Sequence, residues 1–306
     1  MTSRPAKKIK LLVVIIAALI SLLSGCGTGI SSDSDHTQGN EVKKLRMGVV
    51  PSQNPQELLD SYKPMAGFLE KEIKIPVELV VLDDYSQVAR GMRDKQIDFA
   101  VFGPFSYVLA SEIAGAEAFA VGIGPGSETT YKSIIVVRRD SGINRVEDLK
   151  GKSFAFVDPA STTGNLIPRA MFKRIGIDPE KDLKNPIFVG SHDAAELAVQ
   201  SGKVLAAADH NDSYNLMVSK GIISPEEIKI IWESEPIPRS PLAYRKDLPE
   251  ETKKKLRDTV LNIHRMNPSA IGGVIKTIRY DPADDTDYNV IREVAKTLNL
   301  DLSKMK

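Results

Sequence analysis

Two short segments hold the residues whose types and spacing could do chemistry in this chain. Ser161-Thr162-Thr163-Gly164 follows a strand-like run and opens a helix-like run, and Gly190-Ser191-His192-Asp193 follows after about thirty residues. Hydroxyl groups and free N–H groups at a helix start form an anion site, because unpaired donors and the positive end of the helix dipole point the same way. The imidazole of His192 adds a donor, or a positive charge near neutral pH. Together these residues predict a site for a compact oxyanion such as a phosphonate, phosphite or phosphate.

The same residues have two other interpretations. Ser161-Thr162-Thr163 could serve only as an N-cap cluster, since Ser and Thr are preferred there for stability. Ser161, His192 and Asp193 could also be drawn as a catalytic triad. However, no Gly-x-Ser-x-Gly elbow is present, and adjacent side chains such as His192 and Asp193 diverge on a helix. We therefore predict a binding protein with no catalytic residue.

Other sequence motifs of enzymes and cofactor sites are missing. The chain has no Walker loop, no HExxH motif and no Rossmann fingerprint. The Asp83-Asp84 pair resembles two metal ligands, but a turn before the next helix explains it better. We therefore predict no cofactor and no metal.

Strand-like and helix-like segments alternate along the chain. The predicted strands are 45–50, 76–82, 97–102, 117–123, 131–137, 153–157, 186–189, 204–208, 228–232 and a return strand at 239–245. The predicted helices are 55–73, 85–93, 103–113, 163–175, 192–201 and 213–219, and the chain from Pro249 on, including 284–298, is predicted to be helical. Such alternation is typical of an α/β fold with mainly parallel sheets.

The order of these segments predicts two α/β lobes. A Gly/Pro loop ends the first series of segments near 124–130, and the chain returns near 236–242. Two crossing segments would then join the lobes. We expect the ligand between them, where strand ends and helix starts converge.

The N-terminus reads as a targeting segment. A basic stretch precedes the apolar run 11–23, which has the length of a signal-peptide core and is short for a membrane span. The run ends in Leu23-Ser24-Gly25-Cys26, which resembles the lipobox of bacterial lipoproteins, where the cysteine is lipidated. The alternative is a chance cysteine behind an uncleaved anchor. We therefore expect a signal peptide at 1–25, lipidation at Cys26, and a polar, flexible tether over 26–42.

Composition excludes several classes of protein. Cys26 is the single cysteine, so disulfides within the chain and multi-cysteine metal sites are excluded. The first 26 residues carry four of the 41 Lys and Arg and none of the 40 Asp and Glu. The rest of the chain thus has a net charge of about −3, which does not suggest nucleic-acid binding.

The chain resembles the substrate-binding proteins of phosphate, phosphite and phosphonate ABC transporters, the PhnD-like family. The resemblance covers about 45–300 and is carried by the segments 47–51, 98–104, 131–133, 146–152, 161–164, 190–193 and 245–249. It implies a type II periplasmic-binding-protein fold, in which two α/β lobes joined by a two-segment hinge close on the ligand. By position it implies lobe I at 43–130 plus 238–306, and lobe II at 131–237.

The resemblance also implies roles for individual residues. Ser161, Thr162 and Thr163 match the oxyanion clamp, and His192 matches a histidine that reaches the same oxygens. The other matched positions are the pocket tyrosines Tyr85 and Tyr131, Tyr107 as a further residue of the cleft, and Asp209 as an acid facing a ligand's amino group.

One departure from the family pattern bears on the ligand. Arg239 and Ser240 stand where aminoalkylphosphonate binders supply a second acid. This favours a small ligand such as phosphite, methylphosphonate or hypophosphite.

The expected partners follow from the resemblance. They are a small phosphorus oxyanion, the permease subunits of an ABC importer, and the membrane through the lipid anchor, with the protein a monomer on the extracytoplasmic face of a bacterial membrane. Two alternatives stay open: a sensory protein that docks on a sensor kinase, and a binder of sulfonates or other organic anions.

Overall fold

The computed structural model of the chain describes residues 42–305. The predicted signal peptide, the lipidation site at Cys26 and the tether up to Glu41 lie outside the described residues. Within 42–305, none of the helices has the length and apolar character needed to cross a membrane.

The larger sheet has the strand order β13-β4-β12-β3-β1-β2. Its strands are β1 (Leu45–Val49), β2 (Val77–Val81), β3 (Phe99–Val101), β4 (Ala116–Ile123), β12 (Pro241–Arg245) and β13 (Arg279–Pro282). β1 pairs in parallel with β2 and β3, whereas β12 and β13 pair antiparallel with their neighbours. We call this sheet and the helices on its two faces lobe I.

The second sheet has the strand order β10-β6-β9-β7-β8. Its strands are β6 (Ser133–Arg138), β7 (Ser153–Phe156), β8 (Lys184–Phe188), β9 (Ala206–His210) and β10 (Ile228–Glu233). β7 pairs in parallel with β8 and β9, and β6 pairs antiparallel with β9 and β10. We call this sheet and its covering helices lobe II.

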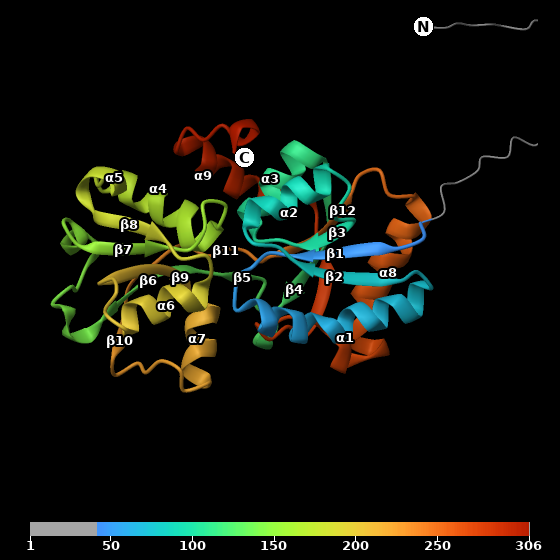
Figure 1. Cartoon of the computed structure of the whole chain (residues 1–306), viewed down its shortest axis with the longest axis horizontal. Helices are drawn as coiled ribbons and strands as arrows, with labels where there is room; N and C mark the ends of the chain where they lie inside the picture. The colour runs from blue at the N-terminus through green and yellow to red at the C-terminus, as the bar shows by residue number, and fades with distance from the viewer. Residues whose placement is uncertain (1–41, 306) are drawn as a thin grey trace, which may run out of the picture. The chain divides into compact units, whose positions relative to one another are not determined.

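Helices cover both faces of each sheet (Figure 1). The described helices are α1 (Pro55–Ile73), α2 (Tyr85–Arg93), α3 (Pro104–Ala114), α4 (Ile167–Arg174), α5 (Pro179–Asp182), α6 (His192–Gln200), α7 (Asn211–Ser219), α8 (Glu250–Met266) and α9 (Asn289–Thr297). In lobe I, α1 and α8 lie on one face and α2 and α3 on the other; in lobe II, α4 lies opposite α6 and α7. In α1 and α8 the buried face follows from the apolar spacing of the sequence, whereas α3 is buried on all sides from Pro104 to Ala110.

Two short strands mark the passages between the lobes. β5 (Thr130–Tyr131) and β11 (Ile237–Pro238) pair antiparallel in a ribbon of their own. The chain enters lobe II through the first strand and leaves it through the second. The C-terminal helix α9 packs against α3 of lobe I and also against α4 of lobe II.

Two predictions about these elements are wrong. The sheets are mixed rather than mainly parallel, because the returning chain inserts β12 between β3 and β4, opposite in direction to β3. Residues 279–282 form the edge strand β13 rather than a helix. This strand is only four residues long, and it pairs with β4, which is distant in the sequence. The local sequence pattern of 279–282 therefore does not predict the pairing.

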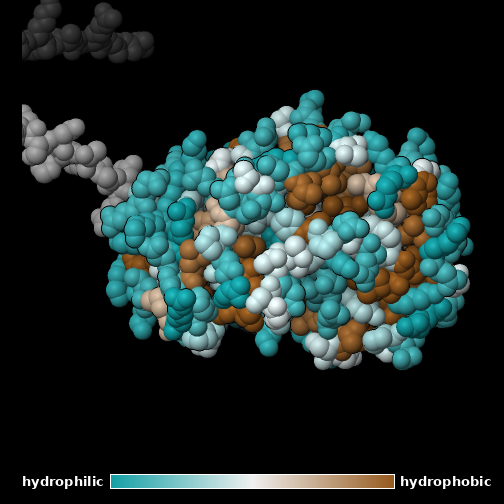
Figure 2. Space-filling model, turned by 180° about the vertical axis from the view of Figure 1, so that it is seen from behind, coloured by the Kyte–Doolittle hydropathy of each residue, from teal (hydrophilic) through white to brown (hydrophobic). Residues whose placement is uncertain are grey.

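Exposed hydrophobic side chains are spread over several elements. They are Phe188, Leu197, Ile222, Met266, Val290 and Leu300. Figure 2 shows hydrophobic residues in several groups among hydrophilic ones on one face of the molecule.

Candidate anion-binding site

Residues of both lobes and of the connecting segments line a cavity of about 120 Å³. Its polar wall consists of Ser52, Gln53, Tyr85, Tyr131, Ser161, Thr162, Thr163, His192, His210, Asp212, Arg239 and Ser240. The other lining residues are mostly apolar and come from lobe I. Of the eight predicted ligand-binding residues, the cavity brings together six, all except Tyr107 and Asp209.

The Ser161–Gly164 segment forms the start of a helix, as the sequence predicts. Ser161 is the N-cap, and its Oγ accepts a hydrogen bond from the N–H of Gly164 at 3.0 Å. The Oγ1 of Thr162 accepts a hydrogen bond from the N–H of Phe105 at 2.8 Å. The segment therefore both caps a helix and lines the cavity, and Thr162 also contacts the start of α3 in lobe I.

A π-helical turn, η4 (Thr162–Leu166), precedes α4 and explains how this helix tolerates Pro168. Proline has no N–H to donate to the carbonyl of Gly164. That carbonyl instead accepts from the N–H of Val157 at 3.0 Å. A Cβ at Gly164 would lie only 2.3 Å from the Cβ of Val157, so this close approach requires glycine.

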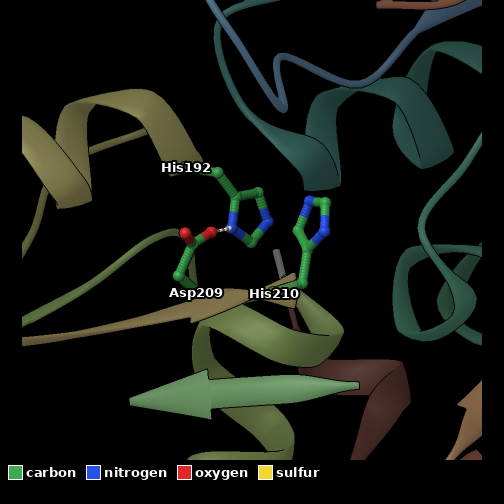
Figure 3. Close-up of side chains that lie close together, drawn as sticks. All are labelled: His192, Asp209 and His210. Carbon is green, nitrogen blue, oxygen red and sulfur yellow. Dashed lines mark hydrogen bonds and ion pairs between the residues drawn. The ribbon is translucent and has the colours of Figure 1, made fainter. Parts of the chain in front are cut away.

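His192 lies at the start of α6, and a buried carboxylate holds its ring. The Nδ1 of His192 and the Oδ1 of Asp209 are 2.7 Å apart, and the two side chains are almost completely buried (Figure 3). Burial lowers the pKa of His192 to about 4 and raises the pKa of Asp209 to about 7. Because the two groups share a hydrogen bond, the two pKa changes belong to the pair as a unit, and the pair loses one proton near neutral pH.

The carboxylate that contacts His192 is not the adjacent Asp193. Asp193 instead accepts a hydrogen bond from the Oγ of Ser191 at 2.5 Å. The Oδ1 of Asp209, at the end of β9, occupies the position behind the ring. The expected divergence of His192 and Asp193 is therefore observed.

His210 is a residue of the cavity wall that the sequence reasoning missed. It is the N-cap of α7, and its Nδ1 accepts a hydrogen bond from the N–H of Ser213 at 3.1 Å. Burial lowers the pKa of His210 well below its usual value, so the ring is neutral with its proton on Nε2. The sequence signal for this role is the position of His210 just before a helix. A histidine that caps a helix through Nδ1 keeps its Nε2–H free as a donor.

A second buried acid lies behind the cavity. Glu196 of α6 is completely buried, and its carboxyl group lies beside Asp209 and the hydroxyl of Ser213. Burial, and then the neighbouring Asp209, raise the pKa of Glu196 to about 11. Glu196 is therefore protonated and uncharged at neutral pH.

The remaining charges of the cavity wall form a pair. Arg239 and Asp212 are joined by an ion pair of 2.7 Å, with 12% and 16% of their side chains exposed. Burial raises the pKa of Asp212, while Arg239 opposes that change. Since both histidines are neutral, the described side chains of the wall carry no net positive charge at neutral pH, and an anion must be held mainly by dipoles.

Tyr85 and Tyr131 both lie in the cavity wall, as predicted. The hydroxyl of Tyr85 is buried without a hydrogen-bond partner in the described part of the chain. Burial raises the pKa of both tyrosines, so both keep their protons. The ring of Tyr131 packs edge-on against His210, with centroids 5.4 Å apart.

Two predicted site residues lie elsewhere. Tyr107 does not line the cavity: its hydroxyl donates to Asp285 at 2.6 Å, beneath α9. Asp209 does not face the cavity either, because the ring of His192 lies on its Oδ1. The family resemblance placed both residues near the cleft, but their side chains point into the interior.

His192, Asp209 and His210 have the residue types of a metal site. However, the Nδ1 of His192 lies on Asp209 and the Nδ1 of His210 lies on the N–H of Ser213. Metal binding at these atoms would require both hydrogen bonds to break. We therefore interpret the two Nδ1 atoms and the carboxylate of Asp209 as a hydrogen-bonded support of the cavity wall.

Comparison with known proteins identifies relatives over most of the chain. Residues 47–288 match the family described as "ABC transporter, phosphonate, periplasmic substrate-binding protein". The chain is 32% identical over 256 residues to the phosphate-import protein PhnD of Mycolicibacterium smegmatis, which covers 80% of this chain and 79% of that protein. It is 30% identical over 232 residues to the phosphonates-binding periplasmic protein of Escherichia coli, which covers 74% of this chain and 68% of that protein.

A solved structure shows the same fold. PhnD1 of Prochlorococcus marinus, in complex with methylphosphonate, superposes with a TM-score of 0.77 at 24% identity and covers 85% of this chain and 99% of that chain. With the sheet topology above, this confirms the predicted type II fold of two lobes joined by two segments.

Proposed function

The chain belongs to the family of periplasmic phosphonate-binding proteins of ABC transporters, and from this premise we propose that it captures a small phosphorus oxyanion in the cavity between its lobes. It is a binding protein of an importer rather than an enzyme, and it acts outside the cytoplasm. The observation that carries the proposal is the cavity itself, where the helix start at Ser161–Thr163 faces His192 and His210.

The proposed oxyanion is held by neutral donors. The first N–H groups of η4 have no partner within their own helix, and the hydroxyls of Thr162 and Thr163 lie beside them. Tyr85 O–H and His210 Nε2–H add donors from other elements. Hydrogen bonds from neutral donors to a charged oxygen are short and strong, and they strengthen further when water is excluded.

His192 contributes through the proton that it shares with Asp209. While the pair keeps this proton, Nδ1 faces Asp209 and Nε2–H can donate to the ligand. When the pair loses the proton, Nδ1–H donates to the carboxylate and Nε2 presents a lone pair. An ionised oxygen of the ligand therefore binds better to the protonated pair.

We propose further that the two lobes close on the ligand and that the closed form docks on a permease. The lobes comprise 43–130 plus 238–306 and 131–237, and they close by bending at the β5–β11 ribbon. The N–H of His192 donates to the carbonyl of Ser52 in lobe I, and Gln53 Nε2 donates to the Oγ of Ser213 in lobe II, at 3.0 Å each. The closed form, tethered by a lipid at Cys26, would deliver its ligand to the permease of an ABC importer.

Calorimetric titration with phosphite, methylphosphonate, phosphate, 2-aminoethylphosphonate and taurine tests the proposal. Binding of at least one phosphorus ligand more tightly than taurine is the expected result. Taurine is a matched control, because it differs from 2-aminoethylphosphonate only in its sulfonate head. Tightest binding of taurine, or no binding of any phosphorus ligand, would refute the assignment.

The lipid anchor is tested separately. The full chain produced in bacteria should fractionate with membranes and carry fatty acid, and Cys26→Ser should abolish the fatty acid. A soluble, unmodified chain would contradict lipidation and leave the ligand assignment intact.

A further inference from the structure

The cavity continues beyond its polar wall into the core of lobe I. Val49 of β1, Val101 of β3 and Leu242 of β12 are direct cross-strand partners in one row and line this part of the cavity. Cross-strand partners present their side chains on the same face of a sheet. The row therefore forms an apolar floor.

Helix α1 and the loop before β13 close this space. Leu58 and Tyr62 of α1 line it from one side, and Val274 of the loop lines it from another. The floor, Leu58, Tyr62 and Val274 all belong to one hydrophobic cluster. We call the space between them the apolar annex.

The annex opens directly onto the anion site. Val50 follows Val49, and Phe102 and Gly103 follow Val101; these three residues line the same cavity as Ser161–Thr163. Gly103 lies beside Thr162, since a Cβ there would be 3.7 Å from the Thr162 Oγ1. A ligand whose oxygens lie at Ser161–Thr163 can thus extend a substituent past Gly103 toward the floor.

The chemistry of the annex favours one kind of substituent. None of the described residues that line it is charged, and the hydroxyl of Tyr280 at its edge already donates to the carbonyl of Gly272 at 3.1 Å. An ammonium group placed there would lose its hydration and meet no charged partner, only the hydroxyl of Tyr62. An alkyl chain would gain by leaving water.

We propose that the annex receives the alkyl substituent of a phosphonate, so that the protein takes unbranched alkylphosphonates longer than methylphosphonate. This inference rests on the proposed function, because it assumes that the oxyanion lies at Ser161–Thr163. It extends the expected ligand from the smallest oxyanions to those with a short carbon tail.

A titration series of methyl-, ethyl-, propyl- and butylphosphonate at constant pH tests the proposal. Each added methylene that enters the annex should lower the Kd about fourfold, and the heat-capacity change of binding should become more negative with chain length. Propylphosphonate and 2-aminoethylphosphonate are matched in shape, and the propyl compound should bind at least about tenfold more tightly.

Val274→Phe places a ring in the annex and should reverse the order of propyl- and methylphosphonate. Val274 lies in a loop, which tolerates the larger side chain better than a strand would. Val290→Phe is the matched control, because Val290 is 48% exposed on α9 and should leave the order unchanged.

A Kd that is flat or rises from methyl- to propylphosphonate, or tighter binding of 2-aminoethylphosphonate than of propylphosphonate, would overturn the annex while leaving the oxyanion site in place. An unchanged order in Val274→Phe would do the same. Failure of every phosphorus ligand to bind would instead refute the proposed function, and the annex with it.

Discussion

Thr162→Val removes one hydroxyl from the proposed oxyanion site and nearly preserves the shape of the side chain. The Oγ1 of Thr162 already accepts from the N–H of Phe105, so we expect the hydroxyl to serve the ligand as a donor. Loss of a hydrogen bond to a charged partner costs about 1.5–3 kcal/mol. The Kd for the preferred phosphorus ligand should therefore rise about 10- to 150-fold.

The same substitution has a second effect, on folding. Valine leaves the N–H of Phe105 without its acceptor, and the start of α3 is buried. An unsatisfied buried donor costs about 1–3 kcal/mol, which for a chain of this size lowers Tm by several degrees, about 2–4 °C per kcal/mol. Thermal unfolding of the ligand-free protein measures this loss separately from the calorimetric Kd.

Two matched variants make the result decisive. Thr162→Ser keeps the hydroxyl and should keep the Kd within a few-fold of the unaltered protein. Thr259→Val removes a hydroxyl from a buried threonine of α8 that does not line the cavity, and it should leave the Kd unchanged. A Kd for Thr162→Val within about twofold of the unaltered protein would refute the role of Thr162 as an oxygen ligand.

Three further predictions concern the buried groups around the cavity. The charge of hypophosphite is fixed near neutral pH, and its affinity should fall as pH rises through about 7, because burial raises the pKa of Asp209 to about 7 and the His192–Asp209 pair then loses Nε2–H. Asp209→Asn should remove this dependence on pH. If the Kd measured by calorimetry for Asp209→Asn varied with pH as it does for the unaltered protein, the shared proton would be contradicted. Glu196 has its folded-state pKa raised to about 11, so its contribution to stability is present at acid pH and is lost progressively as pH rises above its unfolded value. The free energy of unfolding of Glu196→Gln, measured in urea, should therefore rise relative to that of the unaltered protein as pH is raised from about 5 to about 9, by at most about 1.4 kcal/mol per pH unit. If the difference in unfolding free energy between the two proteins were the same at pH 5 and pH 9, Glu196 would be ionised. Gly164→Ala forces its Cβ against Val157 and should cost about 1–3 kcal/mol of stability together with ligand affinity, whereas normal stability and Kd would show that the turn can relax.

The helices were largely predictable because local signals set them. Asn54 caps α1 through its side chain, Pro55 occupies the first turn, and the apolar spacing continues to Ile73, so the predicted and observed bounds agree. α2 likewise has the predicted bounds, with Asp84 as its N-cap. Capping residues and apolar periodicity act within a few residues and can be read from one chain.

Strand direction and side-chain direction were harder to predict. The antiparallel β12 and the edge strand β13 depend on which distant strand they meet. Tyr107 and Asp209 have the expected positions along the chain, but their partners are Asp285 and His192, which come from other elements. The pairing of Arg239 with Asp212 is of the same kind, because it joins a connecting segment to α7.

The bonds between the lobes and the wall of the cavity involve the same residues. Gln53 and Thr162 each line the cavity, and each is bonded across the lobe boundary, to Ser213 and to Phe105 respectively. The N–H of His192 is bonded across it as well, to the carbonyl of Ser52. Any force that separates the lobes must therefore dismantle the binding wall at the same moment. A permease that pulls the lobes apart would lower the affinity and open the exit in one mechanical step, and no separate release signal would be needed.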